Sequence, residues 1–154
     1  MTLIAIDPGW SGGIASIVDG APPETQQMGG DAYEISLQLS KLRNGAGDPV
    51  ICFLEQVGGY IGKAQPGSSA FKFGRNVGIL EGIAIALHFE IRWVRPQTWQ
   101  KSLSALSRPG EEKSAHKRRL KTLAVERYPQ LRQKITLGNC DALLILSYAR
   151  EATK

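Results

Sequence analysis

The chain opens on the segment Thr2-Leu3-Ile4-Ala5-Ile6-Asp7-Pro8-Gly9, an apolar run that stops at an acid, a proline and a glycine. Such a run predicts a buried strand over residues 2–6, ended by the Asp7-Pro8-Gly9 breaker. Gly12 and Gly13 restart the chain into a second apolar run over residues 14–18, which closes at the turn signal Asp19-Gly20. The sequence therefore predicts that the domain begins with two adjacent strands.

Beyond these two strands, helices and strands alternate. A further buried strand is predicted over residues 50–54 and another strand over residues 90–94, and residues 21–30 could hold an edge strand. Apolar residues at helical spacing predict helices over residues 33–42, 69–88 and 111–128. Thr98 and Asn139 are expected to cap a short helix and the last helix. The order predicts an α/β domain with a mixed five-stranded sheet flanked by helices.

Length and composition point to one folded domain over residues 1–154. Of the 154 residues, 42% are hydrophobic and 21% are charged, which excludes a disordered chain. Two cysteines, Cys52 and Cys140, cannot form a disulfide framework, so we expect a reducing compartment such as the cytoplasm. No apolar run approaches the roughly 20 residues of a membrane span. The first residues predict neither a signal peptide nor a transit peptide.

The net charge of +5 is unevenly distributed. Residues 1–60 carry two basic and seven acidic side chains, whereas residues 61–154 carry 17 basic and seven acidic ones. This distribution predicts cation binding by acids of the first part and polyanion binding by the second.

Three acids follow or share apolar segments, where a charge is costly. Asp7 and Glu55 each end a predicted buried strand, and Asp141 lies on the apolar stripe of the last helix. Strand ends of α/β sheets are where ligand sites form, so we expect the three carboxylates to converge and to bind Mg²⁺ or Mn²⁺. The alternatives are an Asx turn at Asp7, a solvated strand end at Glu55 and a favourable first-turn acid at Asp141.

A lysine completes this candidate site. Lys117 shares the apolar stripe of the predicted helix 111–128 with Leu120 and Ala124, so its ammonium could lie beside the metal and a phosphate. Lys113, one turn earlier, competes for this role, and the alternative for Lys117 is a stem that reaches out to solvent.

Basic side chains concentrate in one stretch and one loop. Residues 101–134 hold ten basic and three acidic side chains, which predicts phosphate binding. Rings interleaved with positive charge in and after the predicted loop 58–70 suit base stacking or wedging. Phe73 is expected to belong to the hydrophobic face of the following helix. Phe71 could belong to the same face or contact bases. The candidate DNA contacts are Tyr60, Lys63, Phe71, Lys72, Arg75, Lys101, Lys113, Arg118, Arg119 and Lys121. Residues 107–112 are expected to form a linker.

Motifs of other enzyme classes are missing from the sequence. Neither a Walker A motif nor GxGxxG occurs, so no nucleotide cofactor is expected, and no serine has a histidine at a recognisable spacing.

Several motifs, in this order, resemble the RuvC-like Holliday junction resolvases, nearest to their bacteriophage, prophage and organellar branch. They are IDPGWSGG, FLEQVGGY, SSAFKFGRNVGILEG, VRPQTWQK, KRRLKTLAVERYP and CDALLIL, and they span nearly the whole chain. The resemblance implies an RNase H-like fold and a homodimer that cuts four-way DNA junctions with two metal ions per site. Asp7, Glu55 and Asp141 match family acids, Lys117 (or Lys113) matches a lysine of this branch, and the loop from Gly58 to Phe71 matches the segment that enters the junction.

The chain departs from the family at one position. The family has a further acid three or four residues before the last one, where this chain has Gly138 and Leu137. Either another group supplies that ligand, or the site is weakened, or the acid has been replaced so that DNA is held without being cut.

Two functions of different classes follow, with a third as an outside alternative. As a nuclease, Asp7 would bridge two ions, Glu55 and Asp141 would each bind one, and Lys117 would face the scissile phosphate. As a binding module, the dimer would hold junctions with little or no cleavage. A phosphotransferase of the actin and sugar-kinase superfamily shares the early hairpin, but it needs two such domains to clasp ATP.

Overall fold

The computed structural model describes residues 1–56, 58 and 67–154. Tyr60 and Lys63, together with most of the predicted loop 58–70, lie outside these described residues. The strands are β1 (Thr2–Asp7), β2 (Gly13–Ile17), β3 (Glu24–Gln27), β4 (Val50–Glu55) and β5 (Glu90–Val94). The helices are α1 (Ala32–Asn44), α2 (Gly67–Ala86), α3 (Pro96–Ser102), α4 (Lys113–Arg127) and α5 (Cys140–Ala152), with a short 3₁₀ turn η1 (Pro129–Leu131) after α4.

The five strands form one mixed sheet in the order β3-β2-β1-β4-β5. The hairpin neighbours β1, β2 and β3 pair antiparallel, whereas β4 lies parallel to both β1 and β5. This confirms the predicted α/β fold with a mixed five-stranded sheet.

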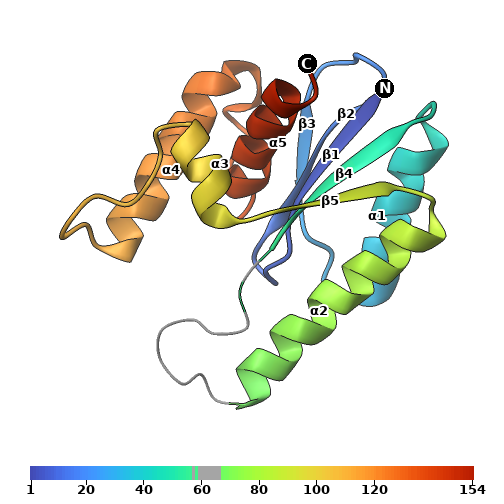
Figure 1. Ribbon diagram of the computed structural model, residues 1–154, viewed down its shortest axis with the longest axis horizontal. Coiled ribbons are helices and arrows are strands. Elements are labelled where there is room, and N and C mark those ends of the chain that lie inside the picture. Colours follow the sequence, from blue (N-terminus) through green and yellow to red (C-terminus); the bar gives the residue numbers. More distant parts are fainter. Residues whose placement is uncertain (57, 59–66) are drawn as a thin grey trace.

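Helices cover both faces of the sheet (Figure 1): α1 and α2 lie on one face, and α3, α4 and α5 lie on the other. Successive side chains of a strand point to opposite faces. Accordingly, Leu3 and Ala5 of β1 join the core under α5, whereas Ile4 and Ile6 join the core under α1 and α2. Helix α5 is buried on nearly all sides, because it packs between the sheet and α4.

The β1–β2 hairpin packs closely against the start of α5. A Cβ atom at Gly13 would lie 2.6 Å from Cβ and 2.8 Å from Cα of Asn139. Only glycine therefore permits this approach, which fixes the position of α5 over the end of β1.

Several predicted boundaries are wrong by two residues or more. Helix α3 begins at Pro96, with Arg95 as its N-cap, because proline suits a first helical turn that lacks N–H partners. Thr98 is therefore inside the helix rather than its cap. Helix α2 begins at Gly67, so residues 67–70 of the predicted loop are helical.

The ends of α4 and α5 also differ from the predictions. Helix α4 begins at Lys113 rather than at residue 111. Glu111 instead accepts two hydrogen bonds from Arg119, which anchor the predicted linker 107–112 to α4. The Arg119 guanidinium and the N–H of Arg108 lower the pKa of Glu111 to about 2. Asn139 occupies the N-cap position of α5, as predicted, but its side chain makes no capping hydrogen bond. Its side chain points back along the chain, where it accepts from the N–H of Thr136 at 2.8 Å and donates to the carbonyl of Lys134 at 2.9 Å.

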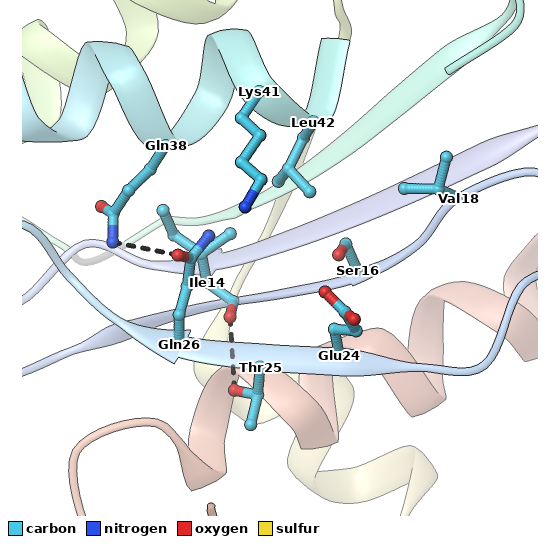
Figure 2. A pocket seen from close by; sticks show the side chains of 9 residues that line it. All are labelled: Ile14, Ser16, Val18, Glu24, Thr25, Gln26, Gln38, Lys41 and Leu42. Carbon is cyan, nitrogen blue, oxygen red and sulfur yellow. Dashed lines mark hydrogen bonds between the residues drawn. The ribbon is translucent and has the colours of Figure 1, made fainter. Parts of the chain in front are cut away.

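A cavity of about 310 Å³ lies between β3 and α1, on the sheet face away from α5 (Figure 2). Among its lining residues, Nε2 of Gln38 in α1 donates a 3.2 Å hydrogen bond to Gln26, and the hydroxyl of Thr25 donates to the carbonyl of Ile14. No helix among the described residues is long and apolar enough to cross a membrane.

Candidate active site

Two carboxylates meet at the carboxyl ends of β1 and β4. The parallel register pairs Ile6 with Leu54, so Asp7 and Glu55 follow as the next residues of neighbouring strands. By strand alternation both side chains lie on the face that carries α5, together with Leu3 and Ala5 in β1 and with Ile51 and Phe53 in β4. The tertiary structure thus brings together two acids that are 48 residues apart in the sequence.

Both carboxylates are largely withdrawn from water. Glu55 is only 7% exposed, and its Oε1 accepts a 2.8 Å hydrogen bond from Nε1 of Trp99. Burial and the neighbouring charge of Asp7 raise the pKa of Glu55 to about 8, although the Trp99 hydrogen bond opposes the rise. Asp7 accepts from the N–H of Gly9 at 3.2 Å. Burial and the charge of Asp141 raise the pKa of Asp7 to about 6, although Lys117 lowers it.

The third acid is held by the candidate lysine. Nζ of Lys117 in α4 lies 2.5 Å from Oδ2 of Asp141 in the first turn of α5. The Asp141 side chain is 15% exposed and that of Lys117 is 34% exposed. Burial alone would lower the pKa of Lys117, but the Asp141 carboxylate outweighs it and holds that pKa above its ordinary value.

The four candidates form one electrostatic group. The charges of Asp7, Asp141 and Lys117 all act on the pKa of Glu55. The charges of Asp141 and Lys117 also act on the pKa of Asp7. The structure therefore brings the four predicted residues together, with Lys117 rather than Lys113 beside the acids. Lys113 is exposed at the start of α4.

Three further residues support this group, and sequence reasoning assigned none of them a role. Trp99 orients Glu55, and Sγ of Cys140 lies 3.3 Å from Oδ1 of Asp141. Burial raises the pKa of the Cys140 thiol to about 12, so it stays protonated at neutral pH. Nδ2 of the fully buried Asn76 donates to the carbonyl of Pro8 at 2.5 Å, which joins α2 to the turn after Asp7. The sequence feature that could have indicated these residues is a side chain with a polar atom at a position that otherwise faces the core.

The oxygen atoms at the site suit a divalent cation in part. Oδ2 of Asp7 and Oε2 of Glu55 accept no hydrogen bond from any described residue, and two crowded carboxylates in a buried position favour Mg²⁺ or Mn²⁺. Asp141 differs, because an ammonium already occupies its Oδ2. Within the described part of the chain, no group of three or more His, Cys, Asp or Glu side chains is arranged to hold a metal ion.

The structure also distinguishes the two positions where the family carries a further acid. A Cβ at Gly138 would lie 2.4 Å from the carbonyl oxygen of Ser11, so no side chain fits there. Leu137 is 46% exposed and has room for another side chain. Of these two positions, only Leu137 has room for the further acid that the resemblance implies.

The candidate DNA contacts that fall on described residues lie on helices α2, α3 and α4. Phe71, Lys72 and Arg75 are exposed on α2, and Asn76 beside them contacts the turn after Asp7. The other candidates on described residues are Lys101 in α3 and Lys113, Arg118, Arg119 and Lys121 in α4. Arg119 is already bound, since its guanidinium contacts Glu111 at 2.8 Å and the carbonyl of Leu106 at 2.8 Å. Phe71 is 71% exposed and so is not a core residue.

Comparison with solved structures finds a similar fold. The structure titled "Thermus thermophilus RuvC structure" matches with a TM-score of 0.60 at 18% sequence identity, over 99% of this chain and 98% of that one. The chain has a RuvC-like fold. No protein-family model and no curated protein sequence matches it. The likeness confirms the RuvC-like, RNase H-like fold expected from the sequence motifs, whereas the phage, prophage and organellar branch stays a prediction.

Proposed function

We propose that this protein is a structure-selective endonuclease that cuts four-way DNA junctions with the help of divalent metal ions. The observation that carries the proposal is the pairing of Asp7 with Glu55 at the ends of parallel strands, with Lys117 and Asp141 over the same sheet face. The RuvC-like fold supports it. Such a group of acids and one ammonium suits phosphodiester chemistry, in which negative charge develops on phosphate oxygens.

The residues have distinct roles in this proposal. Asp7 and Glu55 would hold one metal ion through their available oxygens, and Asp141 would be a ligand of a second ion. A bound divalent ion lowers the pKa of water and stabilises a leaving oxygen. Trp99 and the N–H of Gly9 hold the other oxygens of Glu55 and Asp7, and so orient both carboxylates. Lys117 would supply positive charge to a phosphate bound beside these acids.

Basic side chains near the site would hold the DNA. Exposed Lys72 and Arg75 lie along α2, and Lys113 and Arg118 lie along α4. These elements come from different faces of the sheet (Figure 1), so a DNA strand crossing the carboxyl ends of β1 and β4 would contact both. We expect this activity in the cytoplasm, where bacterial and phage DNA lies.

A junction has two-fold symmetry, so we propose a homodimer. Helix α2 offers an interface, because Phe71 and Ile85 are exposed and a Cβ atom at Gly74, Gly78 or Gly82 would meet nothing within 4 Å. Light scattering at micromolar concentration should give twice the 16.8 kDa mass of one chain. A monomer would contradict symmetric cutting of both strands.

Cleavage of a labelled four-way junction tests the activity. We expect nicks in Mg²⁺ or Mn²⁺, none in EDTA, and little cutting of a linear duplex. Asp7→Asn should lower the cleavage rate by about two orders of magnitude or more, because it removes a metal ligand. The matched control is Asp31→Asn, which makes the same charge change at the exposed N-cap of α1, where asparagine also caps well. Undiminished cleavage by Asp7→Asn would refute the site.

The second candidate is a junction-binding protein that does not cut. Leu137, where an acid is missing, and the Lys117–Asp141 ion pair favour it. Tight junction binding without nicks in either metal would select this function.

A further inference from the structure

Both carboxylate oxygens of Asp141 face another side chain, whereas Asp7 and Glu55 each have only one oxygen with a hydrogen-bond donor among the described residues. Its Oδ2 lies 2.5 Å from the Lys117 ammonium, and its Oδ1 faces Sγ of Cys140 at 3.3 Å. The donors on Asp7 and Glu55 are a backbone N–H and an indole N–H, and each leaves one carboxylate oxygen without a hydrogen bond from the described residues. The three acids therefore divide into an available pair and one that is ion-paired.

The residues one helical turn before Asp141 offer no further ligand for a metal ion. The residues three and four positions before it are Gly138 and Leu137, and neither has a ligating side chain. A helix-type hydrogen bond from the N–H of Cys140 to the carbonyl of Thr136 places residues 137 and 141 one turn apart. A second cation at Asp141 would gain no carboxylate from residues 137 and 138, and the positive charge of Lys117 would repel it.

We infer that Lys117 acts as a built-in competitor for a metal ion at Asp141. One divalent ion binds on the Asp7 and Glu55 oxygens, and a second ion binds weakly because the Lys117 ammonium must first leave Asp141. Lys117 keeps its proton throughout, so the exchange moves one cation for another. The inference rests on the proposed function, because it concerns the metal site of that nuclease.

Mn²⁺ binding in the absence of DNA tests this inference without using activity. Free Mn²⁺ is counted by electron paramagnetic resonance at mildly alkaline pH. We expect one ion per subunit to bind well and a second to bind much more weakly. Lys117→Met, which keeps the length of the side chain and removes its charge, should strengthen the second binding event by roughly tenfold or more. Lys113→Met removes the same charge one turn away and should leave the second binding event unchanged.

A second variant adds a carboxylate beside Asp141. Leu137→Asp adds a carboxylate one turn before Asp141 at an exposed position, and should also strengthen the second binding event with Lys117 in place. Gly138→Asp is not an equivalent, because its Cβ would collide with the backbone of Ser11.

Nitrogen-15 NMR of the lysine ammonium groups gives a readout on the unaltered protein. The Lys117 signal should be protected by Asp141, persist after one equivalent of Mg²⁺ and change only at much higher concentration. Two Mn²⁺ ions of similar affinity in the unaltered protein, or no gain in Lys117→Met, would overturn the inference and leave the proposed nuclease site intact. Failure of the unaltered protein to bind any Mn²⁺ would instead refute the metal site of the proposed function.

Discussion

The indole Nε1 of Trp99 donates a 2.8 Å hydrogen bond to Oε1 of Glu55, and so ties α3 to the carboxyl end of β4. Trp99 is fully buried and Glu55 is nearly so. The bond satisfies one polar atom of each residue inside the core and leaves the second oxygen of Glu55 available. A core contact is thus also the support of a candidate metal ligand.

Loss of this bond should weaken folding and metal binding together. Trp99→Phe removes the donor and leaves a cavity, which we expect to lower the free energy of unfolding by about 2–3 kcal/mol. The affinity for Mn²⁺ should fall by roughly ten- to 100-fold, because Glu55 loses its orienting partner. Urea unfolding and calorimetry measure the two effects. The control is Trp93→Phe in β5, whose side chain is 42% exposed and contacts neither acid by any described hydrogen bond. Unchanged Mn²⁺ affinity in Trp99→Phe would contradict the positioning role.

The metal-free protein should lose stability as the pH rises. Asp7 has its pKa raised from 3.8 to about 6, and Glu55 has its pKa raised from 4.5 to about 8. An acid whose pKa is higher in the folded chain stabilises folding while it is protonated, and this contribution is lost as the pH passes the folded-state value. We therefore expect Tm in EDTA to fall by several degrees between about pH 4 and pH 8, since 1 kcal/mol shifts Tm by about 2–4 °C at this size.

Two further measurements test whether this pH effect comes from Asp7 and Glu55. Glu55→Gln keeps an acceptor for Trp99 and should flatten the upper half of the Tm profile. Mg²⁺ should raise Tm more at the alkaline end, where the carboxylates are ionised. A Tm in EDTA that stays level across this range would contradict the raised pKa values.

Replacement of Gly13 should disturb the contact between the hairpin and α5. Gly13→Ala places a Cβ 2.6 Å from Cβ of Asn139, and we expect a loss of about 1–3 kcal/mol in the free energy of unfolding. Gly45→Ala, at the end of α1, is the control, because the nearest atom to its Cβ would be 3.7 Å away at an ordinary φ of −88°. Equal effects of the two changes in urea unfolding would contradict the close approach.

Neighbouring arginines of α4 should have separable roles. Arg119 binds Glu111 with two hydrogen bonds, so Arg119→Ala should make residues 103–112 more sensitive to limited proteolysis. Arg118 is exposed and forms no ion pair within the described residues. Arg118→Ala should weaken junction binding and reduce its salt dependence by about one phosphate contact, with no change in proteolysis. The reverse pattern in the two assays would overturn this assignment.

The sequence by itself determined the elements and the residue types of the site. Alternating apolar runs defined four strands, and an acid after a buried strand indicated Asp7 and Glu55, because a charge at such a place needs a partner. Helical spacing placed Lys117 and Asp141 on core-facing stripes, and the structure pairs them. Periodicity within one element carries this information, so no long-range contact was needed.

Only the tertiary structure decided how these residues meet. The parallel register of β1 and β4 sets Asp7 beside Glu55, and the close packing at Gly13 sets α5 over them. The partners Trp99 and Cys140, the choice of Lys117 over Lys113 and the absence of room at Gly138 all depend on atoms from elements distant in sequence. Local spacing fixes which face a side chain occupies, whereas packing between elements fixes which charges share a buried space and which already have a partner.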